Sequence, residues 1–178
     1  NPLALNMYVL GFDSKKKLIA LDDTVKQNLR IYLSQYRVLT DAINIKDAYT
    51  INIAVRFSII TQRGYNKNEV LIKCIDAIKN HFDVDKWSIA QPIILSDIAY
   101  VISLVDGVAS VVPPEDDNPQ KQMVVIENKY KVEDGYSGHV YDLQSATKDG
   151  VIYSSLDPSI FELKFPNIDI EGRVVGDI

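Results

Sequence analysis

Apolar and polar residues alternate strictly between Tyr49 and Ile60, with an apolar residue at every odd position. A period of two predicts a strand that turns one face to a core and the other to more polar surroundings. The run is long for a strand, so we expect it to project beyond its own sheet and to be shared with a neighbouring subunit.

Three other segments carry apolar residues at the helical spacing of three and four. Asp22 or Asp23 begins the first predicted helix, and Asn66 caps a second that runs to about Phe82. Ser96 caps a third, which ends at Gly107. Their predicted buried faces are Val25, Leu29, Tyr32, Leu33 and Tyr36, then Val70, Leu71, Cys74, Ile75, Ile78 and Phe82, and finally Ile98, Val101, Ile102 and Val105.

The remaining residues up to Val112 complete an alternation of strands and helices. We predict strands at Leu5–Phe12, Trp87–Ile89 and Val108–Val112, a connector at Thr40–Lys46 and an extended hinge at Ala90–Leu95. Such an order predicts an α+β protein, specifically a two-layer, ferredoxin-like α/β sandwich. Its expected core contains Leu29, Tyr32, Ile53, Val55, Ile75, Ile78, Ile98 and Ile102.

A proline-rich, acidic break at residues 113–119 separates this domain, residues 1–112, from residues 113–178. The second part holds short predicted strands and no helical period, so we expect a β-rich extension that packs on the first domain or on a neighbouring subunit. The predicted strands are Met123–Ile126, Val140–Leu143, Val151–Ser155, Ile160–Phe165 and Ile168–Val175.

The composition is that of a globular protein, with 47% hydrophobic and 24% charged residues. No apolar run is long enough to span a bilayer, and the first residues do not have the pattern of a signal peptide. The missing initiator methionine leads us to expect a fragment of a longer chain. One cysteine excludes an internal disulfide framework and is compatible with a reducing cytoplasm.

Charge is distributed unevenly along the chain. Residues 1–112 carry 13 basic and 11 acidic residues, a net charge of +2, and residues 113–178 carry 6 and 13, a net charge of −7. The acidic part fits either a solvated surface or one that meets a basic partner. It argues against nucleic-acid binding.

The residue types needed for chemistry are sparse, and we predict no catalytic, cofactor-binding or metal-binding site. The two histidines form no zinc motif, and phosphate-binding glycine loops and nucleophile elbows are absent. Glu115, Asp116 and Asp117 lack the ligand spacing of a calcium loop. Lysines 15 to 17 are interpreted as an exposed turn rather than as a phosphate site.

Individual candidates have structural interpretations. Cys74 is expected to be a buried small side chain, with a reactive thiol as the alternative. His81 lies in the last turn of its predicted helix, where the helix dipole favours a cationic imidazole. Ser137, His139 and Asp142 have the residue types of a hydrolase triad, but in a strand they would point to alternating faces.

Three segments resemble the wedge subunits of contractile-tailed bacteriophages, the baseplate J-like family. They are YLSQYRVLTDAINIKDAY with the strand and helix that follow, KWSIAQPIILSDIAYVISLVDGVASV, and the closing GVIYSSLDPSIFELKFPNIDIEGRVVGD. The resemblance covers most of the chain and lies in the order of packing residues. It implies a structural, non-enzymatic protein that joins neighbouring wedges into a ring around the tail hub and rearranges when the tail contracts.

We therefore expect a homodimer that contacts other baseplate wedge proteins and neighbouring wedges, with no nucleic-acid binding and no membrane insertion. Its expected location is the tail baseplate of the virion, after assembly in the host cytoplasm. One alternative is a host-surface glycan- or receptor-binding module that uses Tyr130, Tyr136, Tyr141 and Tyr153. A second is a component of a related contractile injection system.

Overall fold

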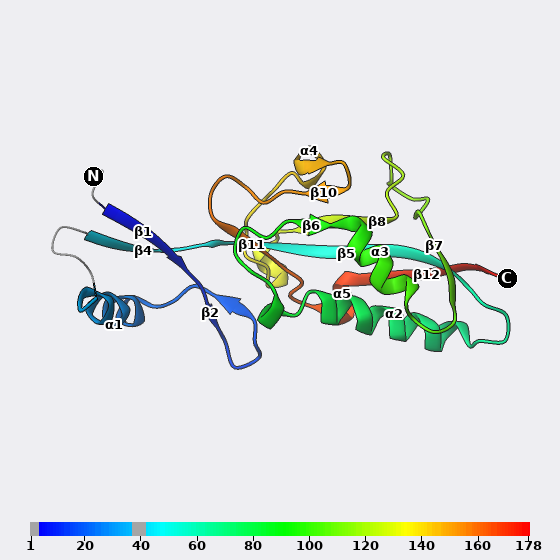
Figure 1. Ribbon diagram of the computed structural model, residues 1–178, viewed down its shortest axis with the longest axis horizontal. Helices are drawn as coiled ribbons and strands as arrows, with labels where there is room; N and C mark the ends of the chain where they lie inside the picture. The colour runs from blue at the N-terminus through cyan, green and yellow to red at the C-terminus, as the bar shows by residue number, and fades with distance from the viewer. Residues whose placement is uncertain (1–3, 37–41) are drawn as a thin grey trace. The chain divides into compact units, whose positions relative to one another are not determined.

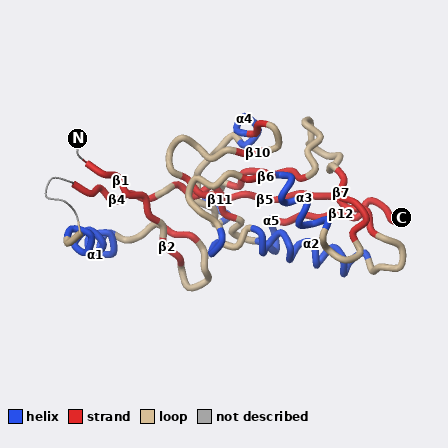
Figure 2. Tube along the Cα trace, viewed as in Figure 1, coloured by secondary structure: helices blue, strands red, loops and turns tan. Residues whose placement is uncertain are grey.

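The computed structural model describes residues 4–36 and 42–178, and the chain divides into two compact units, Asn1–Tyr49 and Thr50–Ile178 (Figure 1). Helices and strands occur in both units (Figure 2), which confirms the predicted α+β class. None of the helices in the described part of the chain is long and apolar enough to cross a membrane.

The described part of the first unit, residues 4–36 and 42–49, holds one helix and four strands. The strands β1 and β4 pair in parallel, and β2 and β3 form an antiparallel hairpin whose turn holds the lysines 15 to 17 as predicted. Asp22 caps the helix through a bond from the Val25 N–H (2.8 Å). The elements are β1 (Ala4–Val9), β2 (Gly11–Phe12), β3 (Leu18–Ile19), α1 (Asp23–Ser34) and β4 (Ala42–Asp47).

Two predictions for this unit are wrong. The expected connector Thr40–Lys46 is largely the strand β4; Thr40 and Asp41 lie outside the described residues. The helix α1 has no buried residue, and Tyr32, expected in the core, is 56% exposed. The period identified an apolar face correctly, but the described part of this unit offers that face little to pack against.

The second unit is organised about one long strand, and its sheet and helices come from both sides of the expected domain boundary. Its helices are α2 (Lys67–His81), α3 (Leu95–Ser103), α4 (Leu143–Ala146) and α5 (Pro166–Asp169), with 3₁₀ turns at Val84–Lys86 and Val132–Asp134. Its strands are β5 (Tyr49–Thr61), β6 (Ile93–Ile94), β7 (Val108–Val112), β8 (Val124–Lys129), β9 (Thr147–Lys148), β10 (Val151–Ile152), β11 (Ser159–Glu162) and β12 (Ile170–Asp177).

The strand β5 is central rather than projecting. Residues 52–57 pair with β8 and residues 58–61 with β7, both antiparallel, while residues 55–61 pair with β12 in parallel. The strand β11 pairs with it as well. These neighbours use the backbone groups of β5 along most of its length. The prediction that β5 projects beyond its sheet and is shared with another subunit is therefore wrong.

The expected boundary after Val112 is replaced by one at Tyr49/Thr50. The proline-rich residues 113–119 do form a loop, but the chain then returns to the same sheet as β8, β11 and β12. The acidic C-terminal part therefore contributes three strands to the sheet of the second unit.

The core of this unit lies between the sheet and two helices. The apolar positions of β5 contribute Ile53, Val55 and Phe57, and α2 adds Cys74 and Ile78, as the sequence predicted. The helix α2 contacts α3 and β12, and α3 contacts β7 and β8, so both helices cover one face of the sheet. Ile98 and Ile102 are buried as predicted, and Ile75 packs against the core.

Several local predictions fail in short segments and at the ends of helices. Trp87–Ile89 is not a strand and follows a 3₁₀ turn, and Ser96 lies inside α3, whose N-cap is Ile94. Gly107 adopts the expected left-handed conformation (φ +94°), but α3 has already ended at Ser103. The predicted strand Val140–Leu143 does not form, and Leu143 begins the four-residue helix α4. The predicted strand Ile168–Val175 forms from Ile170 onward as part of β12, because its first two residues belong to the four-residue helix α5.

Candidate functional site

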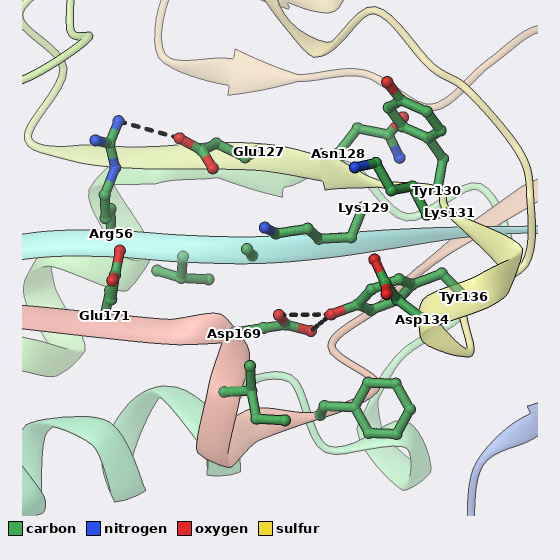
Figure 3. A pocket seen from close by; sticks show the side chains of 14 residues that line it. Arg56, Glu127, Asn128, Lys129, Tyr130, Lys131, Asp134, Tyr136, Asp169 and Glu171 are labelled. Carbon is green, nitrogen blue, oxygen red and sulfur yellow. Dashed lines mark hydrogen bonds and ion pairs between the residues drawn. The ribbon is translucent and has the colours of Figure 1, made fainter.

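A pocket of about 710 Å³ lies on the polar face of the sheet in the second unit (Figure 3). Its floor consists of β5, β8 and β12, and its wall of residues 130–136 and the end of α5. Its size is within the range of pockets that hold small ligands or parts of a partner chain. The lining residues are Ala54, Val55, Arg56, Glu127, Asn128, Lys129, Tyr130, Lys131, Asp134, Tyr136, Phe165, Ile168, Asp169 and Glu171.

Strand register brings charged side chains of both signs to this face. Ala54 is paired with Glu127 of β8, and Arg56 with Glu171 of β12. Side chains on paired residues share a face of the sheet, so Arg56 lies near two acidic side chains. Alternating positions at the end of β8, Glu127 and Lys129, and then Lys131, continue the polar edge.

Arg56 is held at one end of the pocket. Its Nη2 atom lies 3.2 Å from Glu127 Oε1, an ion pair without the geometry of a hydrogen bond, and its Nε–H is buried with no hydrogen-bond partner. A guanidinium presents its N–H groups as a planar fork that fits carboxylates and other paired acceptors. This end of the pocket therefore holds a buried guanidinium donor that is left without a hydrogen-bond acceptor.

Asp169 forms the other end, where α5 meets β12. It is 3% exposed, and the Tyr136 hydroxyl donates to its carboxylate at 2.8 and 2.9 Å. Burial raises the pKa of Asp169 above its ordinary value, although the tyrosine bond and the charge of Lys129 act in the opposite direction. Figure 3 shows Asp169 and Tyr136 turned toward one another at the pocket wall.

A set of amide hydrogen bonds fixes the segment that forms the pocket wall. Asn52 accepts from the Ser137 N–H (2.8 Å) and donates to Glu162 Oε1 (2.9 Å). Asn128 accepts from the Tyr141 N–H (3.0 Å) and donates to the Asn52 carbonyl (3.1 Å). The Ser137 hydroxyl donates to the Thr50 carbonyl (2.6 Å). Asn52, at a polar position of β5, is thus buried with its side-chain oxygen and nitrogen both hydrogen-bonded.

The candidates singled out from the sequence do not gather in this pocket. Cys74 is fully buried, and burial raises the pKa of its thiol to about 11, so the prediction of a buried small side chain is confirmed. His81 stacks edge-on against Phe82 and Trp87. Burial lowers its pKa, whereas the charge of Asp97 acts in the opposite direction, so burial opposes the cationic form that the helix dipole was expected to favour.

The residues of the possible triad have separate structural roles. The Ser137 hydroxyl is bonded to a backbone carbonyl, and Asp142 caps α4 by accepting from the Ser145 N–H (3.2 Å) and hydroxyl (2.5 Å). The His139 N–H donates to Ser137 Oγ (3.3 Å). Hydrogen bonds thus tie Ser137 and Asp142 to the backbone, which is what a scaffold requires of them.

The acidic residues 115–117 and the four candidate tyrosines do not gather at one site either. Asp116 lies 3.6 Å from Arg173 across an exposed surface. Within residues 4–36 and 42–178, no group of three or more His, Cys, Asp or Glu residues is arranged to hold a metal ion. Of the four tyrosines considered for receptor binding, Tyr130 and Tyr136 line the pocket, whereas the Tyr141 hydroxyl bonds the Tyr153 carbonyl (2.5 Å).

Sequence reasoning missed this pocket because its residues come from three separate segments, at 54–56, 127–136 and 165–171. The one local signal was the run Glu127, Lys129 and Lys131, in which charges alternate with other residues after a buried strand. In comparisons with known proteins, no protein-family model and no curated protein sequence matches the chain.

Proposed function

We propose that this chain is a structural subunit of a phage tail baseplate wedge, which joins neighbouring wedges into the ring around the tail hub and rearranges on contraction. The observation that carries the proposal is the small core of the first unit. Among its described residues only Leu18, Ile45 and Ala48 are buried, while its helix α1 buries none. A unit of this kind gains stability by contact with another chain.

The order of elements in the second unit supports the same proposal. The helix α3, the turn at Gly107 and the strand β7 follow one another within the segment that carries the family resemblance. Two helices on one face of the sheet support the finer assignment of a two-layer, ferredoxin-like arrangement. In the proposed role the chain has no enzymatic activity and is located in the virion baseplate after assembly in the host cytoplasm. A related contractile injection system would use the same architecture.

Immunogold electron microscopy tests this role directly. Antibodies raised against the chain are applied to particles from its source, with extended and with contracted tails. We expect gold label at the baseplate in both states. Label on the capsid, on the tail tube or on no particle structure would contradict the proposal. The same labelling on tailed injection particles would distinguish the related machine from a phage.

A host-surface glycan- or receptor-binding module is the second candidate, and the pocket is the observation that favours it. Hydrogen-bond donors and acceptors on positively and negatively charged side chains line the pocket together with Tyr130 and Tyr136. This arrangement suits a neutral ligand rich in hydroxyl groups. A glycan screen with the whole chain tests this candidate. Binding that is lost in Tyr130→Ala and kept in Tyr100→Ala, an exposed tyrosine outside the pocket, would favour it over the assembly role.

A further inference from the structure

Among the residues that the structure describes, the parallel strands β1 and β4 form a two-stranded sheet. Parallel strands are normally found inside larger, covered sheets, and a two-stranded sheet is at best marginally stable in water. Within the described residues, β1 pairs with β4 alone, so its outer edge presents unpaired N–H and C=O groups. Such an edge is a template for a strand from another chain.

The two outer edges of this sheet differ in charge. The strand β4 ends in Lys46 and Asp47, and Asp47 is paired with Lys26 (2.8 Å). Charged side chains on an edge strand oppose pairing with another strand. The strand β1, with the sequence Ala-Leu-Asn-Met-Tyr-Val, has no charged residue, proline or glycine. The edge open to a partner is therefore that of β1.

Exposed apolar side chains accompany this edge in the same unit. Leu5 of β1 is 58% exposed, as is Ile31 of α1. Side chains of this size in a unit with so small a core indicate a surface that another chain covers. The occupant must bring an uncharged strand edge and apolar side chains, and a second copy of this chain carries both.

We propose that β1 pairs antiparallel with β1 of a second copy across a two-fold axis, giving a four-stranded sheet in the order β4, β1, β1, β4. A two-fold axis perpendicular to a strand brings that strand against itself in the antiparallel sense, and one self-complementary edge then serves both copies. The inference rests on the proposed assembly role and names the surface that mediates it. It moves the dimer contact from β5, where the sequence placed it, to the first unit.

Variants of the whole chain that each carry one cysteine in addition to Cys74 test the register. Each residue from Ala4 to Val9 is replaced in turn by Cys, and Cys74, fully buried, serves as the internal control. Paired antiparallel residues have Cα atoms about 4.5–5.5 Å apart, within the range of a disulfide. We expect oxidised dimers only at the one or two positions nearest the axis. Cross-links at every position, or at none, would overturn the proposal.

Sedimentation equilibrium provides the second test. Leu5→Lys places a charge on the β1 edge, and we expect it to weaken dimerisation by at least about tenfold. Ile72→Lys is the matched control, because Ile72 is an exposed residue (60%) of α2 in the second unit. Equal dimerisation of Leu5→Lys and the unchanged chain would overturn the proposal. Baseplate labelling is independent of both variants, so a failed β1 contact is distinguishable from a failed assembly role.

Discussion

At the scale of single residues, Asn52 shows how a polar side chain of the central strand β5 can be buried. Its side-chain oxygen accepts from the Ser137 N–H and its amide nitrogen donates to Glu162, so one residue joins three segments. Its neighbour Thr50 contributes a carbonyl to the Ser137 hydroxyl. A buried amide whose donor and acceptor are both used specifies one arrangement of the chain around it.

Replacing Asn52 by Ala should lower the free energy of unfolding by about 1–3 kcal/mol, because the Ser137 N–H loses its acceptor and the buried Glu162 side chain loses the Asn52 donor. The measurement is denaturant unfolding followed by circular dichroism. Asn80→Ala, at an exposed position of α2, is the matched control and should change stability by less than about 0.5 kcal/mol. Similar small effects in both variants would show that the network does not stabilise the fold.

Asp169 and Asp142 should contribute to stability with opposite dependence on pH. Burial raises the pKa of Asp169 in the folded state, so its contribution is fully present below the unfolded pKa and is lost as pH rises through the folded value. The Ser145 hydroxyl and N–H lower the pKa of Asp142, so its contribution is present above the unfolded pKa and is lost as pH falls through the folded value.

The variants Asp169→Asn and Asp142→Asn test these signs. As pH rises from about 3 to about 7, unfolding free energies should shift in favour of Asp169→Asn and against Asp142→Asn, each relative to the unchanged chain. Urea titrations at several pH values measure both differences. Parallel pH profiles for the two variants would contradict the assignment of a buried acid and an exposed helix cap.

At the scale of elements, the alternating run predicted both the strand β5 and the side chains of its core face. It could not predict what lies on the other face, because Thr50, Asn52 and Ser58 suit solvent and buried hydrogen bonds equally well. The helix α1 shows the same limit. Periodicity shows which face is apolar, whereas the presence of a partner depends on the tertiary arrangement.

The shortest elements were beyond the reach of pattern reasoning. The helices α4 and α5 have four residues each, too few to display a period of 3.6. The strand β4 was read as a connector because its pairing partner, β1, is distant in the sequence. The pocket was missed for the same reason, since only the register of β5 with β12 brings Arg56 and Asp169 to the same pocket.

Ile53 tests the core face of β5 most sharply, because its side chain is fully buried. Ile53→Ala should lower the free energy of unfolding by about 2–5 kcal/mol through lost apolar burial and the cavity it leaves. Ile72→Ala, at the exposed position on α2, should cost well under 1 kcal/mol. A comparable loss in the two variants would show that the strand does not present Ile53 to the core.

At the scale of the whole molecule, the proline-rich loop after Val112 resembled a domain boundary only in its composition. Three strands beyond it return to β5, so the sheet depends on residues separated by most of the chain. A chain ending at Val112 loses β8, β11 and β12 and exposes the core residues of β5. It should show no cooperative thermal unfolding by circular dichroism, in contrast to the whole chain. A sharp transition in the shortened chain would restore the boundary at residues 112/113.

The central claim is that this protein is completed by contact with another copy of itself, as an assembly subunit requires. Sedimentation equilibrium of the unchanged chain between about 1 and 100 µM tests it most directly. We predict a concentration-dependent rise to twice the chain mass of 20.0 kDa. A mass of 20.0 kDa throughout that range would contradict the claim.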